Sequence, residues 1–184
     1  MKLDFAYTSA SETRFKNIIK SENLGLLVFG FAVFFIPFIF GHSTNFPNQL
    51  IVGSLVNALL ASSALHLTLK KSLPIILLPA IAAVLSGFIF GSFSIFLAFL
   101  VPFIWIGNAI YVYFIKNLKI VNKMNYAGAV FISSMLKALF LFISTLILVN
   151  LAIVPEIFLL PMGLVQFGTA LVGGMLGGIT LLKK

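Results

Sequence analysis

The chain has 184 residues, of which 61% are hydrophobic and only 9% are charged, and its mean hydropathy is +1.17. A chain of this length cannot hide so much apolar surface inside a water-soluble core, so the composition predicts that lipid is its solvent. It has no cysteine, two histidines and four acidic residues, which excludes disulfides and thiolate chemistry and argues against a metal enzyme. The formal net charge of +8 would indicate nucleic acid or anionic surfaces in a soluble protein, but in a membrane protein the positions of the cations matter more. We therefore expect no cofactor and no nucleic-acid partner.

Residues 1–23 form a polar arm before the first apolar run, which begins near Leu24. The charged residues in this arm argue against a cleaved signal peptide. Within the arm, the segment from Ser11 to Lys20 places apolar residues at near-helical spacing among cations. This segment is either an amphipathic helix on the membrane surface or a short solvated arm.

Apolar runs separated by polar residues, proline or glycine predict an all-α, polytopic membrane protein. Six membrane-spanning helices are expected near residues 24–40, 50–69, 73–91, 93–115, 126–150 and 158–182. Residues 24–184 would then form one six-helix transmembrane domain. Only Gly91-Ser92 divides the third span from the fourth, which requires a tight turn there; a re-entrant pair of helices is the structural alternative.

The lysine and arginine residues fall on one side of this topology, apart from one inside the fifth span. They precede the first span or follow the second, fourth and sixth: Lys2, Arg14, Lys16, Lys20, Lys70, Lys71, Lys116, Lys119, Lys123, Lys183 and Lys184. The opposite loops, 41–49, 91–92 and 151–157, contain no Lys or Arg. By the positive-inside rule, this asymmetry predicts a multi-pass protein of the cell membrane with both termini in the cytoplasm.

Small residues recur at four-residue spacing on three of the predicted spans, and such faces let helices approach closely in a bilayer. They are Ser54, Ala58 and Ser62 on the second span, Ala83, Gly87 and Gly91 on the third, and Gly173 and Gly177 on the sixth. These faces serve either packing within the chain or contact with another membrane subunit.

Lys137 is the one basic residue far inside a span, and no Asp or Glu lies within any predicted span. A charge at this depth is costly unless it is compensated. Glu156, at the outer end of the fifth span or in the next loop, is expected to lie too far along the helix axis for a direct ion pair unless the loop brings it closer. Two interpretations stay open: Lys137 binds an anionic ligand, or its stem extends along the helix toward an interface.

Neutral amides on other spans are candidates to share a cavity with Lys137. Asn57, Asn108 and Gln166 each offer donors and an acceptor. If they turn inward, the four side chains would form a polar chamber open toward the outer half of the membrane, suited to a small anion or a polar metabolite with one carboxylate. Ordinary interhelical hydrogen bonding is the alternative.

Further candidates are aromatic or lie in the first outer loop. Trp105 either lines a pocket or fills a helix contact, whereas Tyr111 and Tyr113 fit the aromatic belt at the cytoplasmic interface. The polar loop 41–49 adds three candidate ligand-binding residues, His42, Asn45 and Gln49. The loop either caps a site from outside or only meets water.

Signatures of an enzyme are missing from the chain. It has no nucleotide-binding Gly-Lys-Ser loop, no paired carboxylates within the spans and no Ser/His/acid arrangement with a buried acid. We therefore expect no catalytic residues, and any use of ATP requires another subunit.

The layout of six spans with a polar first outer loop resembles the substrate-binding S components of energy-coupling factor (ECF) transporters. Residues 102–109, Pro-Phe-Ile-Trp-Ile-Gly-Asn-Ala, and 134–140, Ser-Met-Leu-Lys-Ala-Leu-Phe, look like segments of small prokaryotic S-component-like proteins. The resemblance implies a binding subunit for uptake of a vitamin or related metabolite, working with a transmembrane coupling subunit and two cytoplasmic ATPases. The family's first span often carries Ala-xxx-Ala on its coupling face, whereas residues 25–35 here read Gly-Leu-Leu-Val-Phe-Gly-Phe-Ala-Val-Phe-Phe.

Two functional hypotheses follow from the sequence. The first is a substrate-binding subunit for uptake of a small vitamin-like or anionic metabolite, with membrane lipid and the coupling subunits as further partners. The alternative is a non-transporting scaffold or assembly protein of the cell-shape type with the same helix plan. Lys137 discriminates between them, because only the first hypothesis needs its charge for a ligand.

Overall fold

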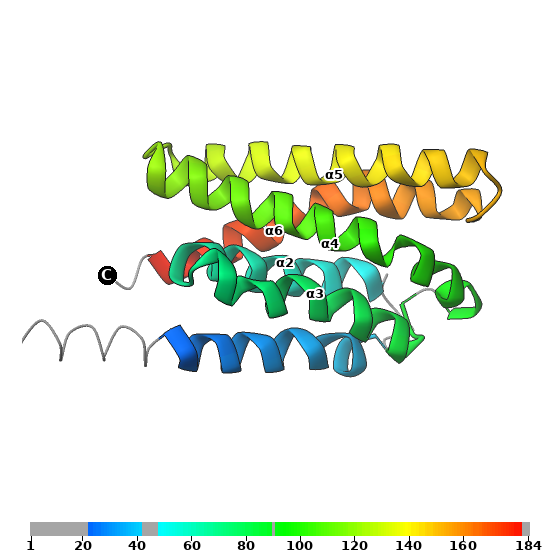
Figure 1. Cartoon of the computed structure of the whole chain (residues 1–184), viewed down its shortest axis with the longest axis horizontal. Helices are drawn as coiled ribbons and strands as arrows, with labels where there is room; N and C mark the ends of the chain where they lie inside the picture. Colours follow the sequence, from blue (N-terminus) through cyan, green and yellow to red (C-terminus); the bar gives the residue numbers. More distant parts are fainter. Residues whose placement is uncertain (1–21, 42–47, 90, 182–184) are drawn as a thin grey trace, which may run out of the picture.

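The computed structural model describes residues 22–41, 48–89 and 91–181, and the regular elements in these ranges are all helices (Figure 1). An N-terminal helix covers Glu22–Phe40, followed by α2 (Asn48–His66), α3 (Leu69–Ser86), α4 (Ser94–Lys116), α5 (Tyr126–Asn150) and α6 (Gln166–Gly177). A π-helical segment, Asn117–Val121, extends α4, while a 3₁₀ turn, Glu156–Phe158, and a second π-helical segment, Pro161–Val165, lead into α6. Six of these helices are long and apolar enough to cross a membrane, the last over Glu156–Gly177. The prediction of an all-α chain with six apolar helices is confirmed.

α3 ends at Ser86, earlier than the predicted end at residue 91, so the connection to the fourth helix begins at Gly87. The predicted turn position, Gly91-Ser92, lies within this connection in a 3₁₀ turn, Gly91–Phe93. Gly87 has a φ of 68° and a ψ of −3°, a left-handed conformation that glycine adopts at little cost and that ends α3. The hydroxyl of Ser94 donates to the Gly87 carbonyl at 2.9 Å and ties the start of α4 to this turn. Both helices keep spanning length, which favours two separate spans over a re-entrant pair.

Successive helices run in alternate directions along the bundle, so the N-terminal helix, α3 and α5 begin at the end where α2, α4 and α6 finish (Figure 1). This lysine-rich end holds the described lysine residues other than Lys137, namely Lys70, Lys71, Lys116, Lys119 and Lys123. α3 begins at Leu69, earlier than predicted, which places two of these lysines in its first turn. The Lys71 amino group lies 2.8 Å from a carboxylate oxygen of Glu22, and this ion pair joins α3 to the N-terminal helix.

Helices α2 and α6 approach closely because glycine forms much of the α6 side of their contact. A Cβ added at Gly173 would lie 2.7 Å from the Cβ of Asn57, and one added at Gly177 would lie 2.8 Å from the Cβ of Ala61. The hydroxyl of Ser62 donates to the Gly177 carbonyl at 3.4 Å. The small-residue faces predicted on the second and sixth spans therefore pack against each other, and neither is open to another subunit in this structure.

Candidate functional site

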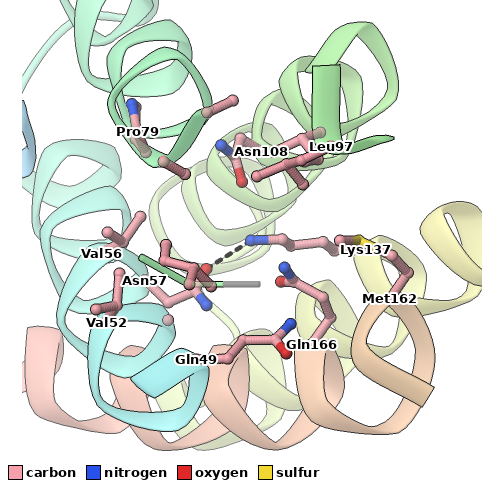
Figure 2. Close-up of a pocket in the computed structure, with 15 residues that line it drawn as sticks. Gln49, Val52, Val56, Asn57, Pro79, Leu97, Asn108, Lys137, Met162 and Gln166 are labelled. Carbon is pink, nitrogen blue, oxygen red and sulfur yellow. Dashed lines mark hydrogen bonds between the residues drawn. The ribbon is translucent and has the colours of Figure 1, made fainter. Parts of the chain in front are cut away.

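A cavity of about 70 Å³ lies near the start of α2 and the end of α3, where five helices meet (Figure 2). Five polar side chains line it: Gln49 and Asn57 from α2, Asn108 from α4, Lys137 from α5 and Gln166 from α6. Apolar residues complete the walls, among them Val52, Pro79, Ala80, Leu97, Ile104 and Met162. The structure thus brings five of the eight predicted ligand-binding candidates to one cavity.

Lys137 lies in the middle of α5 with 2% of its surface exposed. Its Nζ donates a 2.6 Å hydrogen bond to Oδ1 of Asn57, drawn as a dashed line in Figure 2. No carboxylate in the described part of the chain pairs with it: Glu22 pairs with Lys71, and Glu156 is exposed where the 3₁₀ turn begins. The lysine stem therefore ends inside the cavity and does not extend to an interface.

The amide of Asn57 is oriented by its second partner. Its Nδ2 donates to Oγ1 of Thr169 at 3.4 Å, and the Thr169 hydroxyl donates to the Gln166 carbonyl at 3.3 Å. Because the nitrogen of the amide faces Thr169, the oxygen faces the lysine. A short polar chain thus links α5, α2 and α6 beside the cavity.

Trp105 and Asn108 both donate to α3, yet only Asn108 lines the cavity. Trp105 donates from Nε1 to the Leu77 carbonyl at 2.9 Å, so this candidate occupies a helix contact outside the cavity lining. Asn108 donates from Nδ2 to the Ile76 carbonyl at 3.1 Å. Both carbonyls belong to the turn before Pro79, where a proline disturbs the regular backbone hydrogen bonds of a helix.

Gln166 enters the cavity directly after the π-helical segment Pro161–Val165. Such segments interrupt the regular backbone ladder and are frequent near functional sites. Gln49 donates from Nε2 to the Pro161 carbonyl at 3.3 Å and so holds this segment against α2. The Oε1 atom of Gln166 is buried and has no hydrogen-bond partner among the described residues.

Tyr111 and Thr169 belong to the surroundings of Lys137 but were not predicted there. The expectation that Tyr111 lies in an interfacial belt is wrong, because its side chain is fully buried and its hydroxyl donates to the Ala170 carbonyl at 2.7 Å. The Lys137 Nζ lies 5.3 Å from the centre of the Tyr111 ring, within the range of a cation–π contact. Helical spacing was the available signal, since Tyr111 follows Asn108 by one turn and Thr169 follows Gln166 by one turn.

The remaining two candidates, His42 and Asn45, lie outside the described residues, as does the proposed surface segment from Ser11 to Lys20. The predicted cap over the site is therefore still a prediction.

The cavity offers one amino group, several amide donors and acceptors, and an apolar wall. None of the described residues that line it is a carboxylate, so this part of the lining offers no pair of carboxylates for acid–base catalysis and no acid to orient a base. Such an arrangement suits the binding of a small molecule with a negative charge. No protein-family model, curated protein or solved structure matches the chain.

Proposed function

We propose that this protein binds a small anionic metabolite in the cavity around Lys137 and serves as a substrate-binding subunit for its uptake. The burial of Lys137 without a carboxylate partner among the described residues carries the proposal. A buried ammonium whose described contacts are a neutral amide and an aromatic ring is costly in an apolar setting, and an anionic ligand supplies the missing compensation. The amides of Asn57, Asn108 and Gln166 supply further hydrogen bonds to a bound solute.

The proposal places the protein in the cell membrane as a multi-pass protein with cytoplasmic termini. Six apolar helices of spanning length support the membrane location. The concentration of described lysines at one end of the bundle, where α2, α4 and α6 finish, supports the orientation. The cavity near the start of α2 would then lie in the outer half of the bilayer, where a solute arrives from outside.

The proposed partners are a separate transmembrane coupling subunit and cytoplasmic ATPases. The sequence resemblance to S components supports them, and the lack of a nucleotide-binding loop in this chain requires an external source of energy for active uptake. The small-residue faces of α2 and α6 are buried against each other, so docking to a coupling subunit would use another surface.

The test compares the Lys137→Met and Lys116→Met variants in lipid nanodiscs, with butyrate as the probe in isothermal titration calorimetry. Each variant loses one ammonium, but only Lys137 lines the cavity. We expect Lys137→Met to weaken butyrate binding by about 30-fold or more, because the ligand loses its charged partner. Lys116→Met is expected to bind butyrate as the wild type does.

The scaffold alternative predicts a different result. A scaffold would show no saturable butyrate binding, and Lys137→Met would change only its stability. Equal butyrate affinity in the wild type and Lys137→Met would refute the role of Lys137 and with it the proposed binding function.

A further inference from the structure

The cavity lining combines polar and apolar side chains, and this combination limits which anions fit. Lys137, Asn108 and Gln166 present polar groups, whereas Pro79, Leu97 and Ile104 present hydrocarbon. Pro79 and Leu97 lie on the same side of the cavity as Asn108, opposite Gln166 (Figure 2). An inorganic anion would leave the apolar side chains without a contact, whereas a ligand with an anionic group at one end and a short apolar body at the other would contact both kinds of side chain.

Two amides of the lining, those of Asn108 and Gln166, carry oxygens that can accept a hydrogen bond. The Asn108 Nδ2 donates to the Ile76 carbonyl, and Figure 2 shows the rest of this amide turned toward Lys137. The Oε1 atom of Gln166 is buried without a partner among the described residues. The Gln166 side chain lines the cavity, although its Oε1 atom is closed off from it in this structure. Because a buried acceptor without a donor is unfavourable, rotation of this amide toward an O–H or N–H group of a ligand would satisfy the oxygen and raise the affinity. A carboxylate alone satisfies Lys137 but offers nothing to these two oxygens.

The cavity is not suited to a ligand that carries an ammonium group of its own. A zwitterionic amino acid would bring its own ammonium close to Lys137, and the described lining residues include no carboxylate to receive it. The extra donor of the ligand is therefore a neutral one. The cavity volume of about 70 Å³ is far below the roughly 300–1,000 Å³ of pockets for drug-sized molecules, so the ligand is also short.

We propose that the ligand is a short carboxylic acid with a neutral hydroxyl or N–H donor next to the carboxylate and a small apolar body, as in a 2-hydroxy acid. This inference rests on the proposed function, because it uses Lys137 as the partner of the carboxylate. The hydroxyl donates to Oε1 of Gln166 or to the amide oxygen of Asn108, and the apolar body lies against Pro79 and Ile104.

The test uses two matched acids, 2-hydroxybutyrate and butyrate, which differ by one hydroxyl, with chloride as a third probe. Calorimetry on the wild-type protein in nanodiscs is expected to show about 5- to 10-fold tighter binding of the hydroxy acid, the value of one hydrogen bond to a group that is otherwise unpaired. Chloride is expected to bind more weakly than either acid. These wild-type measurements decide the question without any variant.

The Gln166→Met variant tests whether Gln166 is the residue that favours 2-hydroxybutyrate over butyrate. Methionine has a similar length to glutamine but no hydrogen-bonding amide. We expect the affinity ratio of 2-hydroxybutyrate to butyrate to fall below about 2-fold in this variant, because methionine offers the hydroxyl no amide oxygen. Thr145→Val is the matched control: Thr145 also has a buried oxygen without a partner among the described residues, but it does not line the cavity. This control is expected to keep the full preference.

The outcomes separate this inference from the proposed function. Equal affinity for the two acids, or chloride binding as tight as that of 2-hydroxybutyrate, overturns the ligand class and leaves anion binding intact. Failure of all three probes to bind the wild-type protein overturns both proposals.

Discussion

Lys116 and Lys137 lie on the adjacent helices α4 and α5 and both donate to α2, but their surroundings differ. The Lys116 Nζ donates to two backbone carbonyls at the lysine-rich end, of Ala64 at 3.1 Å and Leu67 at 2.7 Å, and its side chain is partly exposed. Lys137 is buried in mid-helix with one amide oxygen, that of Asn57. The Lys116 ammonium thus binds backbone carbonyls at the end of α2, whereas the Lys137 ammonium makes one hydrogen bond to the described residues and can donate further ones to a ligand. The depth of burial and the number of partners distinguish the two roles.

The greatest loss of stability is expected when Lys137 loses Asn57, its hydrogen-bond partner among the described residues. Asn57→Leu leaves the ammonium buried without a hydrogen bond, and we expect the free energy of unfolding to fall by about 3–5 kcal/mol. Reversible unfolding of the purified protein in mixed detergent micelles measures this change.

A double variant sharpens this prediction. Asn57→Leu combined with Lys137→Met removes both members of the pair, so it is expected to be more stable than Asn57→Leu alone. If the double variant is as unstable as the single one, the cost lies in the α2–α6 contact near Gly173 and not in the stranded charge.

A smaller loss is expected at the lysine-rich end. Lys116→Met removes two hydrogen bonds, to the carbonyl of Ala64 near the end of α2 and to that of Leu67 just after it. Water near this end partly replaces them, so we expect the free energy of unfolding to fall by about 1–2 kcal/mol. The same unfolding assay measures it. A loss as large as that of Asn57→Leu would break the distinction between the two lysines.

The smallest effect is expected for Glu22→Gln, which breaks the ion pair to Lys71. The two side chains are 20% and 25% exposed, so water screens the pair and the loss of stability should stay below about 1 kcal/mol. Raising the salt concentration should reduce the difference between wild type and variant in the same assay. A difference that salt leaves unchanged would show that the N-terminal helix depends on Glu22 for more than charge.

The number of helices was predictable because length and hydropathy decide which segments can cross a bilayer. The residue at which α3 ends was not predictable, because the apolar run continues past Gly87 and the hydropathy pattern does not reveal a residue with left-handed backbone conformation within it. The candidates Lys137, Asn57, Asn108 and Gln166 were predictable for a related reason: polar residues stand out within apolar spans.

The sequence did not reveal which polar residues would line the cavity, because this depends on how each helix is rotated and which helices it contacts. Trp105 and Asn108 are one turn apart on α4, yet only Asn108 lines the cavity. Tyr111, read as interfacial from its position near the end of a span, is buried because its helix face turns toward α6. Hydropathy describes how each residue partitions between water and lipid, but it does not say which way a helix face points.

Six apolar helices, lysines on alternate connections and one lysine apart from the others all follow from the residue pattern along the chain. Helix packing is what places Lys137 in a cavity with Asn57 as its hydrogen-bond partner and with no described carboxylate to neutralise it. Composition and periodicity act along each helix separately, whereas a binding site forms from the rotation and close approach of several helices. Here the glycine residues of α6 permit the approach that places Asn57 beside the lysine.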